Sequence, residues 1–202
     1  MEIKGIKQES VYEIVINKSK FIAYSFIVNN LQEIEKKLSF LTQKYSDATH
    51  ICYAYSIYPN KEKSFDDAEP QGTAGKPILD CIKKGGYQNV LVAVVRYFGG
   101  IKLGAGGLVR AYSSGASNVL KNSGIKIAEK CCKFNFLLSI NESKFLQTLQ
   151  SLNLKNFEYS FGEKISIFAY CKIDELESTK TQIKNILSRD IDFLVDRADY
   201  FI

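Results

Sequence analysis

The sequence predicts an α+β protein of two domains that meet near residue 130. Short stretches alternate apolar and polar residues, as strands do, and others repeat apolar residues every three to four positions, as helices do. The charge balance also changes along the chain. Residues 1–130 contain 18 Lys and Arg against 12 Asp and Glu, whereas residues 131–202 contain 9 against 10. A basic first half favours a polyanionic partner such as nucleic acid.

The first 57 residues predict a hairpin, a helix and a third strand. Residues 11–16 and 21–28 are rich in β-branched and aromatic side chains and flank a polar turn, so we expect a hairpin. Asn30 fits the cap of the following helix, with Glu33 at its third position. Residues 50–57 alternate with a period of two, which predicts a strand with His50 and Cys52 on the same face.

Residues 58–77 are expected to form a long loop. They contain all three prolines of the chain, which argues against regular structure. Pro77 fits the first position of a short helix over residues 78–84, which Gly85 and Gly86 end. Ordered loops of this length are often functional.

A buried strand, a glycine-rich loop and a helix follow. Residues 90–95 are uninterruptedly apolar, which predicts a central strand buried on both faces. Five of the nine residues from Gly99 to Gly107 are glycine, so the backbone there can approach a ligand closely. From Leu108 the apolar residues have helical spacing. Free N–H groups at the start of this helix, with basic side chains nearby, favour an anion.

We therefore predict a nucleic-acid or anion site made of basic side chains, one aromatic ring and the loop glycines. Its residues are Lys76, Arg96, Tyr97, Gly99, Gly100, Lys102, Gly104, Gly106, Gly107 and Arg110. A candidate acidic partner cluster consists of His50, Asp66, Asp67 and Glu69. These carboxylates either bind free N–H groups of the loop, pair with arginines of the site, or hold magnesium. We favour the structural roles, and expect no metal and no cofactor.

Two nucleotide-binding motifs fail in this region. Residues 104–109 lack the last glycine of the dinucleotide fingerprint. Residues 72–77 have too short a spacing for a P-loop, and Pro77 replaces the magnesium-binding Ser or Thr. An enzyme stays open as the alternative, either a small-molecule kinase or a hydrolase using Cys52 and His50. Those two side chains are about 7 Å apart from strand rise alone, which is beyond a hydrogen bond and disfavours the hydrolase. No kinase motif is complete either, so we favour a binding protein without a small-molecule substrate over an enzyme.

Residues 131–202 predict a second α+β domain. A last strand of the first domain covers residues 125–130. Strands at 134–140, 156–161, 165–173 and 193–201 then enclose two helices, the second capped by Asp174. The order β-α-β-β-α-β is the ferredoxin-like pattern.

The composition also bears on location. No apolar stretch reaches the length of a membrane span, and the N-terminal residues show no apolar leader. Five cysteines, an odd number, are expected to be reduced thiols. We therefore expect a cytoplasmic protein without a membrane partner.

Three long segments resemble the IMPACT/YigZ family of small translation-associated proteins. They are DATHICYAY (Asp47–Tyr55), DDAEPQGTAGKP (Asp66–Pro77) and VVRYFGGIKLGAGGLVRAYS (Val94–Ser113). The resemblance implies a fold like ribosomal protein S5 domain 2 for residues 1–130, and a ferredoxin-like domain similar to those of elongation factor G for residues 131–202. It also implies a regulatory binding protein that contacts RNA, the ribosome or a translation factor. Phe65, Ala68 and Ile51 depart from the family pattern.

Overall fold

The computed structural model describes residues 2–201, apart from the side chains of residues 197–199 and 201. The described chain divides into two compact units. The first unit is Lys4–Ile127, and the second comprises residues 2–3 and 128–201. Strand β7 (Ile125–Leu138) passes from the first unit into the second as one strand of 14 residues. The prediction of two separate strands here is wrong, because no glycine or proline interrupts this stretch.

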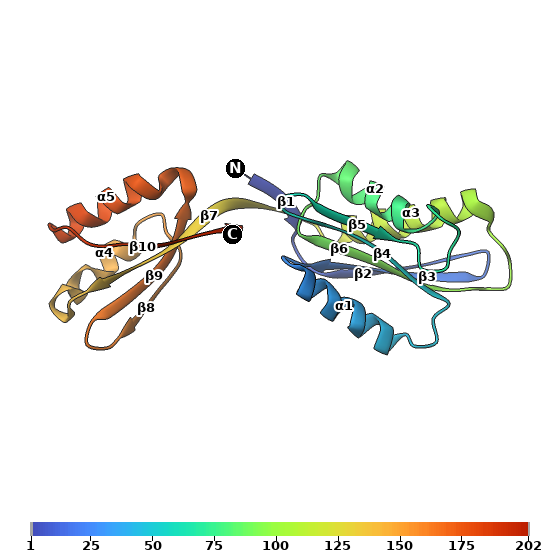
Figure 1. The fold of residues 1–202 in the computed structure, drawn as a ribbon, viewed down its shortest axis with the longest axis horizontal. Coiled ribbons are helices and arrows are strands. Elements are labelled where there is room, and N and C mark those ends of the chain that lie inside the picture. Colours follow the sequence, from blue (N-terminus) through green and yellow to red (C-terminus); the bar gives the residue numbers. More distant parts are fainter. Residues whose placement is uncertain (1, 202) are drawn as a thin grey trace. The chain divides into compact units, whose positions relative to one another are not determined.

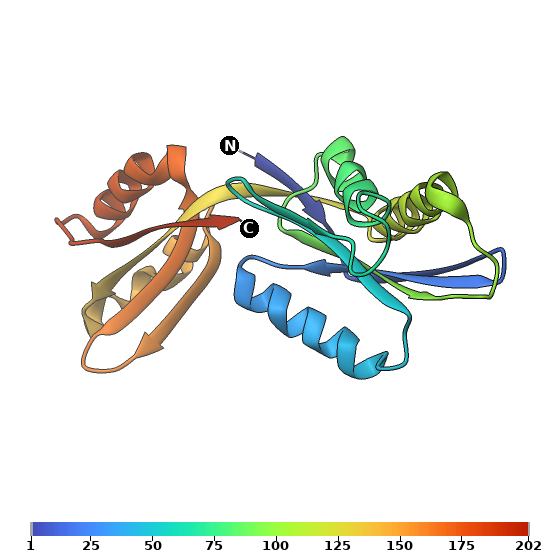
Figure 2. The same ribbon diagram turned by 45° about the vertical axis from the view of Figure 1, so that its right-hand side comes forward.

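The first unit contains a five-stranded antiparallel sheet with helices on both faces (Figures 1 and 2). The strand order is β2-β3-β6-β4-β5. The elements are β2 (Ser10–Ile16), β3 (Ser19–Ile27), α1 (Leu31–Lys44), β4 (His50–Ile57), β5 (Lys61–Phe65), α2 (Gly75–Gly85), β6 (Val90–Tyr97) and α3 (Gly104–Asn122). Strand β1 (Glu2–Ile6) is not part of this sheet, because it pairs with β7. Helix α1 covers one face, and α2 and α3 cover the other.

The predicted core elements of this unit are confirmed. Strand β6 is central, and the side chains of its first six residues are fully buried. The hairpin turns at Asn17 and Lys18, which both have positive φ. Asn30 caps α1, because its Oδ1 accepts the Glu33 N–H at 2.9 Å. Local patterns of period and capping therefore determined these elements.

Three boundaries differ from the prediction. Strand β5 lies inside the segment predicted as a loop, where it pairs with β4 at the edge of the sheet. Helix α2 begins at Gly75, so Pro77 is its third residue and not its first. Helix α3 begins at Gly104, four residues before Leu108. Its first turn is glycine-rich and lacks apolar residues with helical spacing, so the periodicity begins only at Leu108.

The second unit is also a mixed α/β layer structure. β7 pairs with β10 on one side and β9 on the other, and β9 pairs with β8. The elements after β7 are two turns of 3-10 helix (Ile140–Phe145 and Ile173–Glu175), α4 (Leu146–Gln150), β8 (Lys155–Phe161), β9 (Ile165–Lys172), α5 (Leu176–Leu187) and β10 (Leu194–Phe201). The S5-like and ferredoxin-like assignments are finer than this architecture and stay predictions.

The predicted cap of α5 is wrong. Asp174 lies within the second 3-10 turn, and α5 begins two residues later at Leu176. Within residues 172–176 no side chain caps the start of this 3-10 turn or the start of α5. Among residues 2–201 no helix is both long and apolar enough to cross a membrane.

Candidate anion-binding site

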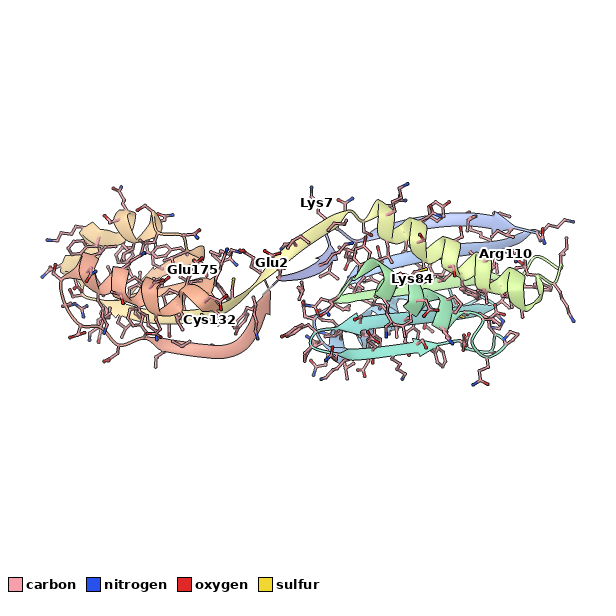
Figure 3. The ribbon with its side chains drawn as sticks, turned by 90° about the horizontal axis from the view of Figure 1, so that it is seen from above. Glu2, Lys7, Lys84, Arg110, Cys132 and Glu175 are labelled. Carbon is pink, nitrogen blue, oxygen red and sulfur yellow. The ribbon has the colours of Figure 1, made fainter. Side chains whose placement is uncertain are left out.

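The starts of α2 and α3 lie at the same end of the helical layer. The Cys81 thiol of α2 donates to the Ser113 carbonyl oxygen of α3, and Lys84 and Lys121, further along each helix, line one cavity of about 490 Å³. The two helices therefore run in the same direction. Figure 3 shows Arg110 near the start of α3 and Lys84 on α2. Within Gly75–Gly85 and Gly104–Asn122, the first turns contain no acidic residue.

Three predicted basic residues are exposed at this end. Lys76 is the second residue of α2, Lys102 lies in the loop before α3, and Arg110 lies in the second turn of α3. Gly99 and Gly100 lie in the same loop as Lys102, and Gly104, Gly106 and Gly107 form the first turn of α3. The positive end of the α3 dipole and these cations make the region attractive to anions.

Arg96 does not belong to this exposed surface. It is 5% exposed, and its Nη1 pairs with Glu69 Oε1. The same Glu69 oxygen accepts the Tyr112 hydroxyl at 2.8 Å. The prediction that Arg96 contacts a phosphate is therefore corrected: it is a buried residue with an internal partner. The alternative prediction, pairing of the acidic cluster with Arg96, is what the structure shows.

Tyr97 also differs from the prediction. Neighbouring residues of a strand point to opposite faces, so Tyr97 packs on the α1 side of the sheet, away from the side chain of Arg96. Its hydroxyl donates to Asp47 Oδ1 at 2.7 Å, and this hydrogen bond raises the pKa of Tyr97 to about 12. The two residues that the sequence placed in one site are thus separated by the sheet.

Asp66 holds the loop before α2 in place. Its Oδ1 accepts the N–H groups of Ala74 and Gly75 at 2.9 and 2.7 Å, and its Oδ2 accepts that of Gly72 at 2.8 Å. Burial opposes ionisation of this carboxyl, but the three hydrogen bonds outweigh it and lower the pKa of Asp66. The predicted binding of loop N–H groups is therefore confirmed for Asp66, whose two oxygens are both occupied.

The rest of the acidic cluster does not converge on a metal. Asp67 Oδ2 accepts the Ile51 N–H at 3.2 Å and lies 3.4 Å from His50 Nδ1, whereas Glu69 faces Arg96. In the part of the chain that the structure describes, no three His, Cys, Asp or Glu side chains could hold a metal ion together.

Cys52 is a buried packing residue. Its thiol donates to the Asp66 carbonyl oxygen, with the sulfur at 3.1 Å, and the Tyr112 hydroxyl oxygen lies 3.4 Å from the same sulfur. Burial raises the pKa of Cys52 to about 12. The thiolate is the nucleophilic form, so a thiol with this pKa is inert at neutral pH. The structure thus gives no support to a hydrolase that uses Cys52 and His50.

The structure adds Lys18 to the basic set, which sequence reasoning missed. A Cβ on Gly99 would collide with the backbone of Lys18 and Ser19, so the glycine loop packs directly against the β2–β3 turn. Exposed Lys18 therefore lies beside the loop that contains Lys102. The glycine at position 99 indicated a close approach, but the sequence could not show which segment approaches.

Gly106 has no packing role of its own. A Cβ there would meet only the flexible Arg110 Nη1, at 3.7 Å, among residues 2–201. Its φ is also outside the positive range, unlike that of Gly104 at +68°. A glycine inside a helix costs about 0.5–1 kcal/mol relative to alanine. The structure therefore gives Gly106 no internal contact that would require a glycine.

Sequence reasoning also missed the apolar side chains of this surface. Phe98, Ile101 and Val109 are 45%, 44% and 37% exposed. They lie in the glycine loop and at the start of α3, among the basic residues. None of these three side chains was assigned a role from the sequence.

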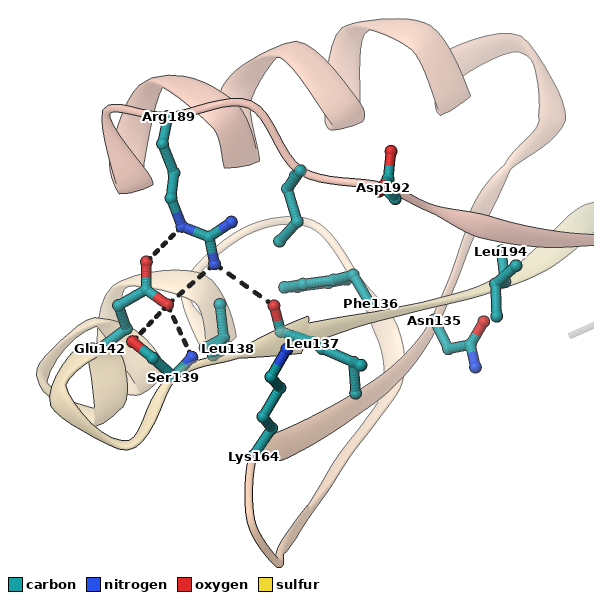
Figure 4. A pocket seen from close by; sticks show the side chains of 11 residues that line it. Asn135, Phe136, Leu137, Leu138, Ser139, Glu142, Lys164, Arg189, Asp192 and Leu194 are labelled. Atoms are coloured by element: carbon teal, nitrogen blue, oxygen red, sulfur yellow. Dashed lines mark hydrogen bonds and ion pairs between the residues drawn. The ribbon is translucent and has the colours of Figure 1, made fainter.

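A cavity of about 570 Å³ in the second unit has different chemistry (Figure 4). Arg189 crosses it to Glu142, with Nε–Oε1 and Nη2–Oε2 distances of 2.6 and 2.9 Å. Hydrogen bonding to Arg189 lowers the pKa of Glu142 to about 2. Both charges are satisfied within the unit, so we do not assign a ligand to this cavity.

Comparisons with known proteins agree with the resemblance of the three segments. The model of the Impact N-terminal domain matches residues 17–120. IMPACT family member YvyE of Bacillus subtilis is 43% identical over 89% of this chain and 88% of that protein. The chain belongs to the IMPACT family. IMPACT family member YigZ of Escherichia coli is 36% identical over 52% of this chain and 54% of that protein.

One solved structure supports the overall fold. The crystal structure of a hypothetical protein aligns with a TM-score of 0.71 over 98% of each chain, at 21% identity. The two-domain translational regulator Yih1 aligns over 60% of this chain and 47% of that chain, at 21% identity and a TM-score of 0.34, which does not show a shared fold.

Proposed function

We propose that this IMPACT family member is a non-enzymatic regulatory protein of translation that binds RNA, free or in the ribosome. Its binding surface consists of Lys18, Lys76, Lys102 and Arg110 around the first turn of α3, and we call it the basic end. The observation that carries the proposal is the shared position of two helix starts, which brings their dipoles and these cations to one place.

The acidic cluster does not weaken this surface. Asp66 is engaged by backbone N–H groups, Asp67 contacts His50, and Glu69 pairs with buried Arg96. Asp66 and Glu69 are thus engaged inside the protein, and of the three carboxylates Asp67 is the exposed one, with a side chain 39% exposed. The proposal therefore places the phosphates on the cations of the basic end, away from Asp67. The translation-associated character of the family favours RNA or a ribosome-bound factor over other polyanions.

The enzyme alternative has little support. Each candidate magnesium ligand is engaged within the protein, and neither nucleotide motif is complete. We therefore expect no rise in melting temperature with ATP and magnesium. A concentration-dependent rise that Asp66→Ala abolishes would favour the kinase reading instead.

The salt dependence of RNA binding tests the proposal. If four cations each neutralise one phosphate of single-stranded RNA, log affinity should fall against log salt with a slope of about −3. Arg110→Ala should flatten the slope by roughly 0.7 and should weaken binding to RNAs of different sequence by the same factor. Lys121→Ala is the matched control, because Lys121 is an exposed cation in the last turn of the same helix.

Two outcomes would contradict this assignment. An unchanged slope for Arg110→Ala places the RNA site elsewhere, and an equal effect of Lys121→Ala makes the binding non-specific. A pull-down from lysate with and without nuclease then asks whether ribosomes accompany the wild-type protein and not the Arg110→Ala variant.

A further inference from the structure

Phe98 is an exposed aromatic ring with a rigid support beneath it. The Arg96 guanidinium carbon lies 5.6 Å from the centroid of the Phe98 ring and 5.4 Å from that of Phe21. Arg96 is itself held by the buried ion pair with Glu69. A cation close to a ring is attracted by its π-electrons, so Arg96 fixes Phe98 from the protein side. The ring is still 45% exposed.

The backbone around Phe98 is fixed as well. The Phe98 N–H donates to Thr49 Oγ1 at 2.9 Å, and the Gly99 N–H donates to Ser19 Oγ at 3.2 Å. Gly99 also packs against the backbone of Lys18. A ring that is ordered before binding loses little conformational entropy when a partner covers it.

We infer that Phe98 is a stacking platform for an unstacked base of single-stranded RNA. Bases stack on aromatic side chains independently of sequence, and cationic side chains beside the ring hold the adjoining phosphates. Lys18 lies against the neighbouring Gly99, and Lys102 lies in the same loop. RNA fits this combination better than an apolar protein surface, because it presents flat rings and phosphates together. The inference rests on the proposed function, and it replaces Tyr97 with Phe98.

The test compares a short oligouridine with the same RNA made abasic, which keeps the phosphates and removes the bases. Phe98→Leu should weaken binding to oligouridine by about fivefold to a hundredfold. It should leave binding to the abasic RNA and the salt slope unchanged, because the cations remain. Phe98→Tyr should bind as the wild type does. Phe40→Leu is the matched control, since Phe40 is 47% exposed on α1 and also has a lysine near its ring.

If Phe98→Leu does not fold, binding to both RNAs will be weakened equally. An experiment on the wild-type protein covers that case. Photocrosslinking with RNA containing 4-thiouridine should label the peptide that contains Phe98. The inference is overturned if only other peptides are labelled, or if wild type and a folded Phe98→Leu bind oligouridine with equal affinity. The proposed function is tested separately, by the salt slope of Arg110→Ala.

Two further results are also decisive. If wild-type protein binds neither RNA at low salt, both the inference and the proposed function are wrong. If Phe98→Leu keeps full RNA affinity but loses a nuclease-resistant protein partner, this surface docks a protein and the inference is overturned.

Discussion

Removing the Glu69 carboxylate should destabilise the first unit strongly. The Glu69 and Arg96 side chains are 3% and 6% exposed, so solvent does little to screen either charge. Breaking a buried ion pair on one side leaves the other charge unpaired, at a cost of about 3–5 kcal/mol. Glu69→Gln keeps one oxygen that can accept the Tyr112 hydroxyl, so we expect about 3 kcal/mol.

Urea unfolding followed by circular dichroism measures this loss. The transition of the first unit should move to lower urea with an unchanged slope, as expected for a loss of stability alone. Glu62→Gln is the matched control: its partner is Lys83, and the two side chains are 34% and 53% exposed. An exposed pair contributes up to about 1 kcal/mol, so this variant should change little.

A double variant separates the interaction energy of the Glu69–Arg96 pair from the effect of each single substitution. Arg96→Met combined with Glu69→Leu removes both charges, so it should be less destabilised than either single change. A cost below about 1 kcal/mol for Glu69→Gln would refute the reasoning, since it would mean that Arg96 is solvated and free to bind phosphate. Simple additivity in the double variant would refute the coupling.

Two further predictions concern a glycine and a carboxyl group. Gly106→Ala should stabilise α3 by about 0.5–1 kcal/mol, seen as a higher melting temperature, yet weaken RNA binding. Gly99→Ala is its contrast and should unfold the loop, because the new Cβ meets the β2–β3 turn. In the second unit, pairing with Arg189 lowers the pKa of Glu142 from 4.5 to about 2. This contribution to stability is therefore complete above pH 4.5 and is lost as the pH falls towards 2. Glu142→Gln should remove that part of the pH dependence in acid unfolding.

Each of these results has an outcome that would contradict it. Unchanged RNA affinity in a stabilised Gly106→Ala protein would mean that no partner approaches this helix start. An identical acid unfolding profile for wild type and Glu142→Gln would mean that the ion pair does not contribute.

Periodic and capping signals determined much of the first unit. The Asn30 cap, the turn at Asn17 and Lys18, and the buried strand β6 all depend on residues that are close in sequence. Strand β5 escaped prediction because KEKSF has no buried face: every residue is exposed at the edge of the sheet. A strand that is stabilised mainly by backbone pairing leaves little pattern in its side chains.

The sequence by itself determined the basic character of the candidate site, the choice of Lys76, Lys102 and Arg110 as its cations, and the family. Tertiary structure alone decided which neighbours share a surface. Glu69 meets Arg96 across 27 positions, and Gly99 meets Ser19 across 80. Those pairings bury Arg96, bring Lys18 to the loop and support Phe98. The physical reason is that period and caps act over a few residues, whereas burial and pairing across the sheet depend on how distant segments pack.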